Sequence, residues 1–257
     1  MKHPLRTLLL AVCCGLAAAC TQRQERLKLM SYNIRNGIGI DNIQDIGRIA
    51  QVILREAPDL VALQELDSAT LRVDGRYIPG ELGRMTGMHA TFGRAIGFAG
   101  GSYGIGLLSR TEPLAVRSIP LPGREEARVL LMAEFPDYTV CVTHLSLTPE
   151  DRLASLPIIR EATDTCRKPV LLAGDFNTGN AAAVLAGLGG GFRILSDTTR
   201  MTFPSDNPAV RIDYILGRGL PTSATVAESA VDHTATASDH CPLWVTLVWK
   251  RGKQPGK

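Results

Sequence analysis

The chain has 257 residues, of which 45% are hydrophobic and 21% charged, so it is long and apolar enough to bury a large core, and disorder is not its default state. Its formal net charge of +3 falls to +1 when a segment that holds Lys2 and Arg6 is removed. So small a charge is not the basic footprint typical of a nucleic-acid-binding protein, although it does not exclude a locally basic groove.

The first twenty residues, MKHPLRTLLLAVCCGLAAAC, follow the plan of a secretory signal: basic residues, an apolar run from Leu8 to Ala19, then small residues. The run is too short to span a bilayer comfortably. Its end resembles the bacterial lipoprotein signal, in which the cysteine, here Cys20, carries the lipid. We therefore expect an extracytoplasmic protein anchored to a membrane through Cys20. Thr21, rather than Asp, follows this cysteine, which resembles the pattern of lipoproteins sorted to the outer membrane. An ordinary signal that leaves a secreted chain is the alternative.

Three cysteines follow that segment, namely Cys141, Cys166 and Cys241. No C-x-x-C pair or zinc-type Cys/His spacing occurs, which argues against a metal–thiolate site. Cys141 and Cys241 lie in strand-like runs and are expected to be small core residues. One disulfide among the three cysteines is also compatible with the sequence.

The first half of the mature chain predicts buried strands around an amphipathic helix. Ile46, Ile49 and Ile53 share one helical face, with Asn42 as the expected cap and Pro58 as the stop signal. The other elements expected here are strands over 27–34, 59–66 and 90–92 and a short helix over 81–86.

Strands dominate the second half. Thr148 and Pro149 open a helix that Pro157 is expected to kink. The strand-like runs cover 103–109, 129–135, 138–145, 169–176, 212–216 and 242–249. Many buried strands with few helices predict an α/β (α+β) chain in four layers, two packed sheets with helices outside, rather than a doubly wound parallel sheet. We expect a signal over 1–20, a tether over 21–26, one domain over 27–249 and a basic tail over 250–257.

Polar side chains stand at the ends of several of these strands, and buried polar groups rarely occur singly without partners. They are Asn33, Glu65, His144, Asp175, Asn177, Asp213, Asp239 and His240. If the strands converge, the carboxylates would repel one another unless a cation lies among them, and oxygen ligands suit Mg²⁺, with Mn²⁺ as a substitute. Asp175 and Asn177 are expected to share a face because residues two apart on a strand do so.

Seven fragments in order carry a resemblance over essentially the whole mature chain. They are SYNI (31–34), LQE (63–65), YGIGLLSR (103–110), THL (143–145), GDFN (174–177), TFPSDNPAVRIDYIL (202–216) and SDH (238–240). Together they resemble the endonuclease/exonuclease/phosphatase family. The resemblance implies the deoxyribonuclease I-like fold, with two packed mixed sheets.

The resemblance also implies roles around a metal and a water molecule. Glu65 would bind the divalent cation, and Asn33 would hold the metal shell or a phosphate oxygen. Asp175 would orient and deprotonate the attacking water, which Asn177 would help to position. Asp239 would bind metal or water.

At the phosphoryl group, the resemblance implies that His240, oriented by Asp213, and His144 contact the oxygens. Tyr103 and Arg128 are further substrate-binding residues that it suggests. Arg128 lies in EEAR, which is similar to a Glu-Pro-Arg segment of relatives but lacks the proline; a solvated charged face is the alternative for this stretch. No acid near Tyr103 is available to pair with His144, so its protonation state stays open.

We therefore predict a monomeric, Mg²⁺-dependent phosphodiesterase or phosphatase that acts outside the cytoplasm on a lipid-linked or small phosphoester. A secreted or surface-anchored nuclease is the alternative within enzymes, with nucleic acid as its substrate. A non-catalytic surface binding module is the alternative of another class.

Overall fold

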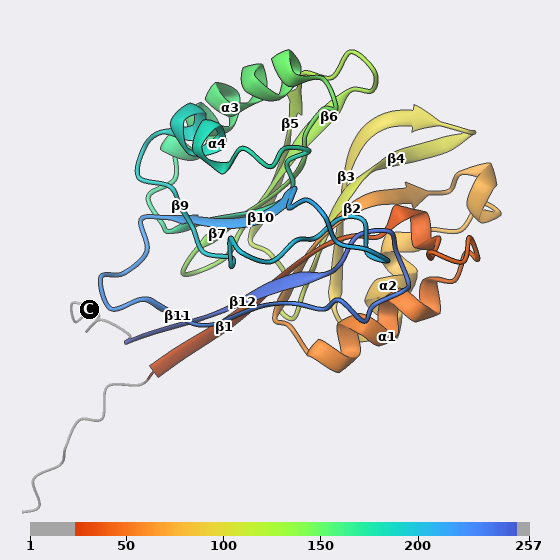
Figure 1. Ribbon diagram of the computed structural model, residues 1–257, viewed down its shortest axis with the longest axis horizontal. Helices are drawn as coiled ribbons and strands as arrows, with labels where there is room; N and C mark the ends of the chain where they lie inside the picture. Colours follow the sequence, from red (N-terminus) through yellow and green to blue (C-terminus); the bar gives the residue numbers. More distant parts are fainter. Residues whose placement is uncertain (1–23, 251–257) are drawn as a thin grey trace, which may run out of the picture.

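Two six-stranded β-sheets pack face to face in the computed structural model of the protein, which describes residues 24–250 (Figure 1). The first sheet has the order β11 (Thr225–Val231), β12 (Leu243–Lys250), β1 (Gln24–Asn33), β2 (Leu60–Ser68), β4 (Gly101–Ser109), β3 (His89–Phe98). The second has the order β5 (Ala115–Leu121), β6 (Arg128–Glu134), β7 (Thr139–His144), β8 (Val170–Asp175), β10 (Asp213–Arg218), β9 (Arg193–Ile194). Both sheets are mixed, because β1 and β2 run parallel, as do β7 and β8, while the other pairs are antiparallel. The predicted fold class is confirmed.

The space between the sheets is filled by side chains that alternate along the strands. On β1, Leu27 and Leu29 point into this layer, whereas Met30 and Tyr32 point to the outer face. This is the period of two that a strand imposes on its side chains. Because both faces of the central strands are covered, these strands are apolar almost throughout, which is why the sequence marks them clearly.

Helices cover the outer face of each sheet (Figure 1). The helix α1 (Ile46–Glu56) and the helix α2 (Ile78–Thr86) pack on the first sheet, and α3 (Pro149–Asp164) and α4 (Ala181–Leu188) pack on the second. Two short 3₁₀ turns, η1 (Arg35–Gly37) and η2 (Leu71–Val73), follow β1 and β2.

The helix ends differ in detail from the sequence prediction. Asp45, rather than Asn42, caps α1, because its carboxylate accepts a hydrogen bond from the Gly47 amide. Asn42 instead has a left-handed backbone with φ of 60°. α3 continues through Pro157 to Asp164.

Besides the two 3₁₀ turns, three strands and one α-helix are absent from the sequence prediction, namely β5, β9, β11 and α4. β5 and β11 are edge strands whose residues are mostly exposed, so no apolar alternation marks them. β9 has only two residues. In α4, the Asn180 side chain accepts a hydrogen bond from the Ala183 amide and caps the helix. The Ala-rich sequence that follows has no polar face, so no amphipathic pattern marks it as a helix.

The ends of the described chain bear on the predicted segments. β1 begins at Gln24, so residues 24–26 of the expected tether are strand, and β12 includes Lys250. The expected signal peptide and Cys20 lie outside the described residues. Within 24–250, no helix is long and apolar enough to cross a membrane. The three cysteines of this range are free thiols, and Cys141 and Cys241 are buried as expected.

Candidate active site

A pocket of about 380 Å³ opens at the end of the sandwich where β1, β7 and β8 finish and β10 starts, beside the bulge of β2. It is lined by Glu65, Tyr103, Glu126, Arg128, His144, Leu147, Asp175, Asn177, Phe203, Ile212, Asp239 and His240. Eight of the residues singled out from the sequence are among them. The other two within the described chain, Asn33 and Asp213, are buried and contact the lining residues directly.

Glu65 reaches the pocket because β2 is bulged. The register between β2 and β4 shifts between Leu63 and Leu66, and Glu65 has a left-handed backbone with φ of 58°. A bulge re-aims the side chain at its centre, here away from the regular alternation of the strand. A strained backbone at a non-glycine residue is a feature that functional sites retain.

The amide of Asn33 joins two carboxylates. Its Nδ2 donates to Glu65 Oε1 at 3.0 Å and to Asp175 Oδ2 at 3.2 Å. Its Oδ1 accepts from the Arg35 amide at 3.1 Å. Asn33 therefore directs its Nδ2 at the site and holds the carboxylates of Glu65 and Asp175 in place.

Asp175 and Asn177 share the pocket for a different reason from the one predicted. β8 ends at Asp175, and Asn177 has φ of 50°, so strand alternation does not align them. A turn does: the Asn177 amide donates to Asp175 Oδ1 at 2.8 Å, and its Nδ2 donates to the Leu145 carbonyl at 2.8 Å. Gly174 permits the close approach of β8 to β7, since a Cβ there would lie 2.0 Å from the Thr143 carbonyl oxygen.

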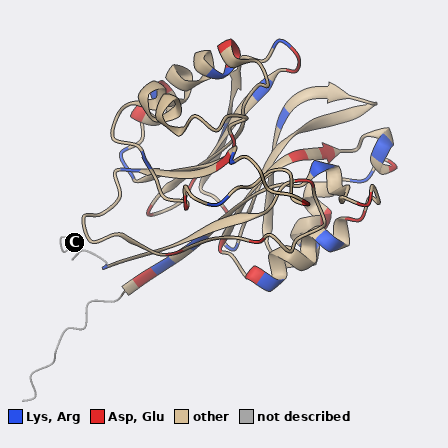
Figure 2. Ribbon diagram, viewed as in Figure 1, with Lys and Arg blue, Asp and Glu red and all other residues tan. Residues whose placement is uncertain are grey.

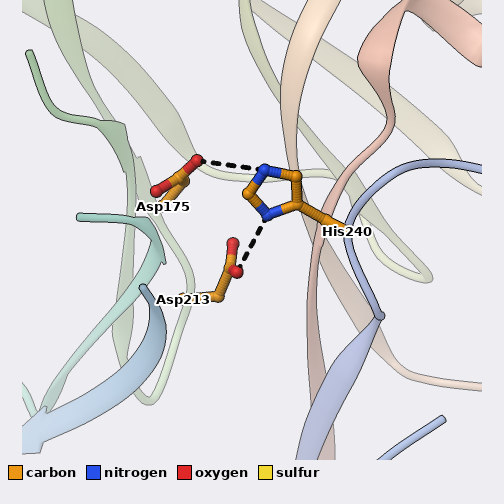
Figure 3. Close-up of side chains that lie close together, drawn as sticks. All are labelled: Asp175, Asp213 and His240. Carbon is orange, nitrogen blue, oxygen red and sulfur yellow. Dashed lines mark hydrogen bonds and ion pairs between the residues drawn. The ribbon is translucent and has the colours of Figure 1, made fainter. Parts of the chain in front are cut away.

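Asp213 and His240 form a buried pair (Figure 3). His240 Nδ1 lies 3.0 Å from Asp213 Oδ2, while its Nε2 lies 3.7 Å from Asp175 Oδ2. Burial opposes the charged form of His240, but the Asp213 carboxylate and its hydrogen bond outweigh burial and raise the pKa of His240 to about 10. His240 is thus an imidazolium at neutral pH.

The surroundings of Asp175 disfavour the charged form of its carboxyl group. Burial and the nearby Asp213 charge raise the pKa of Asp175 to about 7, although His240 acts in the opposite direction. A carboxyl group with a pKa near the working pH suits a general base.

His144 is in the opposite state to His240. Burial, the Arg128 guanidinium and the charge of His240 hold the pKa of His144 well below its usual range, so the ring is neutral. The contact of its Nδ1 is Arg128, whose Nη1 lies 3.3 Å away.

Arg128 is not part of a solvated face. Its side chain is 7% exposed and forms ion pairs with Glu125 at 3.3 Å and Glu126 at 3.0 Å. Arg124, by contrast, is 63% exposed and pairs with Asp151. Arg128 thus lines the pocket with its two Nη atoms engaged by Glu125 and Glu126, and its binding of substrate stays a prediction.

Two further predicted residues lie at the edges of the pocket. Asp239 is partly exposed and forms an ion pair with Arg35, 3.4 Å between Oδ2 and Nε. Tyr103 is buried beside the Arg72 guanidinium, and burial raises its pKa far above the ordinary value, so its hydroxyl stays protonated.

Sequence reasoning missed Glu126 as a pocket residue and also missed an apolar wall. The wall consists of Leu147, Phe203 and Ile212, and the Phe203 ring lies 4.8 Å from that of His240. Phe203 and Ile212 lie inside a quoted fragment, yet nothing in the fragment distinguishes a pocket residue from a core residue.

The donor set fits a hard divalent cation. Asp175, Asp213 and His240 offer ligand atoms within 4.8 Å of one another (Figure 3), and Glu65 and Asp239 add carboxylates to the same pocket. Asp213 Oδ1 is buried without a hydrogen-bond partner, and burial together with the Asp213 charge raises the pKa of Asp175. Asp213 Oδ2 and His240 Nδ1 bind each other, and both oxygens of Asp175 accept hydrogen bonds from Asn177 and Asn33. Glu65 and Asp239 are therefore the better oxygen ligands.

Comparison with known proteins gives one family and many similar folds. The family model described as Endonuclease/Exonuclease/phosphatase family matches residues 30–240. No curated protein matches the chain.

Three solved structures illustrate the fold similarity. An endonuclease/exonuclease/phosphatase from Bacteroides vulgatus has a TM-score of 0.70 and 20% identity, over 87% of this chain and 98% of that one. The mannosyl-6-phosphatase Bt3783 of Bacteroides thetaiotaomicron VPI-5482 has a TM-score of 0.68 and 19% identity, over 86% and 99%. D. rerio TDP2 complexed with single strand DNA product has a TM-score of 0.67 and 22% identity, over 86% and 98%.

Proposed function

Because the chain belongs to the endonuclease/exonuclease/phosphatase family, we propose that it hydrolyses phosphoester bonds with the help of a divalent cation, preferentially Mg²⁺. The observation that carries this proposal is the convergence on Asp175: Asn33 donates to its Oδ2, and both His144 and His240 have Nε2 within 3.7 Å of that same atom. A base flanked by a neutral and a cationic histidine is suited to a reaction in which water attacks an anionic group.

Each residue has a role in this reaction. Asp175 accepts the proton of the attacking water, and Asn177 beside it helps to orient that water. General-base help supplies only ~3–5 kcal/mol of the roughly 20 kcal/mol that phosphoester hydrolysis can require. The positive charge of His240 and the N–H of His144 must therefore stabilise the phosphoryl oxygens as well.

Glu65 and Asp239 would hold the cation, and Asn33 would keep the carboxylates of Glu65 and Asp175 in position. When bound, the ion supplies positive charge that offsets the carboxylates and polarises the phosphoryl group. The acids of the pocket outnumber its one arginine and His240, and that arginine is already paired, so a bound cation would offset negative charge that these side chains leave.

For the substrate class, we favour a small or lipid-linked phosphoester over a polynucleotide. Leu147, Phe203 and Ile212 form an apolar wall of the pocket, which suits an apolar group on the ester. Along the ribbon of the described chain, lysines and arginines are interspersed with acids (Figure 2). A long polyanion needs several phosphate contacts, which such a distribution does not provide.

We also propose that the protein acts outside the cytoplasm, held to a membrane by a lipid on Cys20. The sequence LAAAC at residues 16–20 supports this. Cell fractionation of the wild type and of Cys20→Ser is the test, and the variant should leave the membrane fraction or remain unprocessed. A wild-type chain that is wholly soluble and unmodified at Cys20 would refute the anchor.

A hydrolysis screen with the purified mature chain and Mg²⁺ tests the activity. The substrates are p-nitrophenyl phosphate, bis-p-nitrophenyl phosphate, sugar phosphates, phospholipid vesicles, single-stranded oligonucleotides and plasmid DNA. We expect a small or lipid-linked ester to have the highest kcat/KM, with a shallow dependence on salt. Efficient plasmid cleavage that collapses between ~50 and ~200 mM salt would favour a nuclease instead, and no hydrolysis at all would favour a binding module.

A further inference from the structure

His144 lies between two groups of opposite hydrogen-bonding character. Its Nδ1 is 3.3 Å from Nη1 of Arg128, and a guanidinium has donors but no acceptor. Nδ1 must therefore accept the hydrogen bond, which leaves the ring proton on Nε2. On the other edge of the ring, Nε2 is 3.6 Å from Oδ2 of Asp175, which can accept. Both contacts favour the same tautomer.

The guanidinium that imposes this choice is fixed in position. Nη1 of Arg128 also donates to Glu126 Oε1 at 3.0 Å, and Nη2 donates to Glu125 Oε1 at 3.3 Å. Glu125 in turn accepts from the Leu147 amide and the Ser146 hydroxyl, each at 2.8 Å. One carboxylate thus holds both Arg128 and the segment that follows His144.

We propose that Arg128 is a positioning residue that holds His144 in its Nε2–H tautomer, so that this N–H donates to a phosphoryl oxygen in the pocket. The two histidines then differ by what lies behind them: Asp213 behind His240 stabilises a cation, whereas Arg128 behind His144 selects a neutral donor. The effect on rate rests on the proposed function, but the tautomer does not.

The first test uses the wild-type chain with Mg²⁺. Nitrogen-15 NMR of the histidine rings reports which nitrogen is protonated, and the His144 signals are identified by their absence in His144→Gln. We expect a neutral ring with the proton on Nε2. A ring protonated at Nδ1, or at both nitrogens, would overturn the proposal. A chain with the expected tautomer but no phosphoester hydrolysis would instead refute only the proposed function.

Substitutions of Arg128 test the cause. In Arg128→Gln, the amide can turn its oxygen toward Nδ1, so we expect a mixture of tautomers and a kcat lower by about 10–100-fold, with KM little changed. Arg128→Lys keeps a donor-only side chain and should retain the Nε2–H form and more activity. An Arg128→Gln variant that loses activity while keeping the wild-type tautomer would overturn the positioning role.

A third comparison leaves Arg128 unchanged. The amide nitrogen of glutamine lies near the position of imidazole Nε2, and that of asparagine lies near the position of Nδ1. His144→Gln should therefore retain more activity than His144→Asn. The reverse order would contradict a donor at Nε2.

Discussion

His240 Nδ1 lies 3.0 Å from Asp213 Oδ2, and both side chains are almost fully buried. A buried histidine ordinarily loses its charge, yet the carboxylate reverses this and raises the pKa of His240 to about 10. The free energy of this ion pair is fully present below the unfolded-state pKa of histidine, and it is lost as the pH rises through about 10.

Asp213→Asn should therefore lower the pKa of His240 while leaving a hydrogen-bond acceptor in place. We expect kcat at neutral pH to fall by about 10²–10³, because a positive charge that stabilises the phosphoryl oxygens is lost. NMR titration of His240 and pH–rate profiles check both effects. Asp74→Asn, at an exposed left-handed position, is the matched control and should change neither. A His240 pKa unchanged in Asp213→Asn would show that Asp213 does not set the charge.

Asp175 should make the stability of the metal-free protein depend on pH. Because its pKa is raised to about 7 in the folded state, the folded state binds the proton more tightly than the unfolded state does between pH 4 and 7. Its contribution to the free energy of unfolding therefore falls as the pH rises through this range. We expect Mg²⁺ to raise Tm more at pH 8 than at pH 5. Asp175→Asn should reduce the difference between the Mg²⁺-induced rises in Tm at the two pH values. An equal difference in the variant and the wild type would refute the raised pKa of Asp175.

Asp175→Asn should also lower kcat by about 10²–10⁴ with a comparatively small change in KM, since the lost proton transfer matters in the transition state. Steady-state kinetics on the best substrate from the screen measure this. A variant impaired mainly in KM would remove Asp175 from the role of base.

Glu65→Gln should weaken Mg²⁺ binding by about tenfold or more, because an oxygen-ligand site loses one charge while the size of the side chain is preserved. Calorimetric titration with Mg²⁺ gives the affinity without requiring activity. Glu161→Gln, on the exposed face of α3, is the control and should bind Mg²⁺ as the wild type does. Equal affinity in the two variants would contradict the metal assignment.

Leu147→Ser should raise KM for a phosphoester that carries an apolar group and leave KM for a sugar phosphate nearly unchanged. Leu147 is 64% exposed and lines the pocket, while Leu114 has the same exposure and does not line it. Leu114→Ser is therefore a control for the loss of an exposed leucine. If the two serine variants behave alike with every substrate, the apolar wall does not select the substrate.

The central strands and the residues at their ends could be read from the sequence. β1, β2, β7, β8, β10 and β12 are covered on both faces, so each leaves a continuous apolar run that stands out against turn residues. A polar residue at the end of such a run is costly unless it is used, which is why Asn33, Glu65, Asp175 and Asp213 were identifiable. The edge strands β5 and β11 could not be predicted, because their residues are mostly exposed and form no continuous apolar run.

Which polar groups meet, and through which atoms, was decided only by the tertiary structure. Asn33 and Asp175 are 142 positions apart, and Arg128 and His144 lie on different strands. Their pairing depends on sheet order and on the depth of each side chain in the pocket, and neither leaves a local pattern. The bulge at Glu65, the turn that aligns Asn177 with Asp175, and the opposite protonation of the two histidines follow from those contacts. The sequence therefore determined the chemical groups of the site, and the packing of the two sheets determined their charge states and directions.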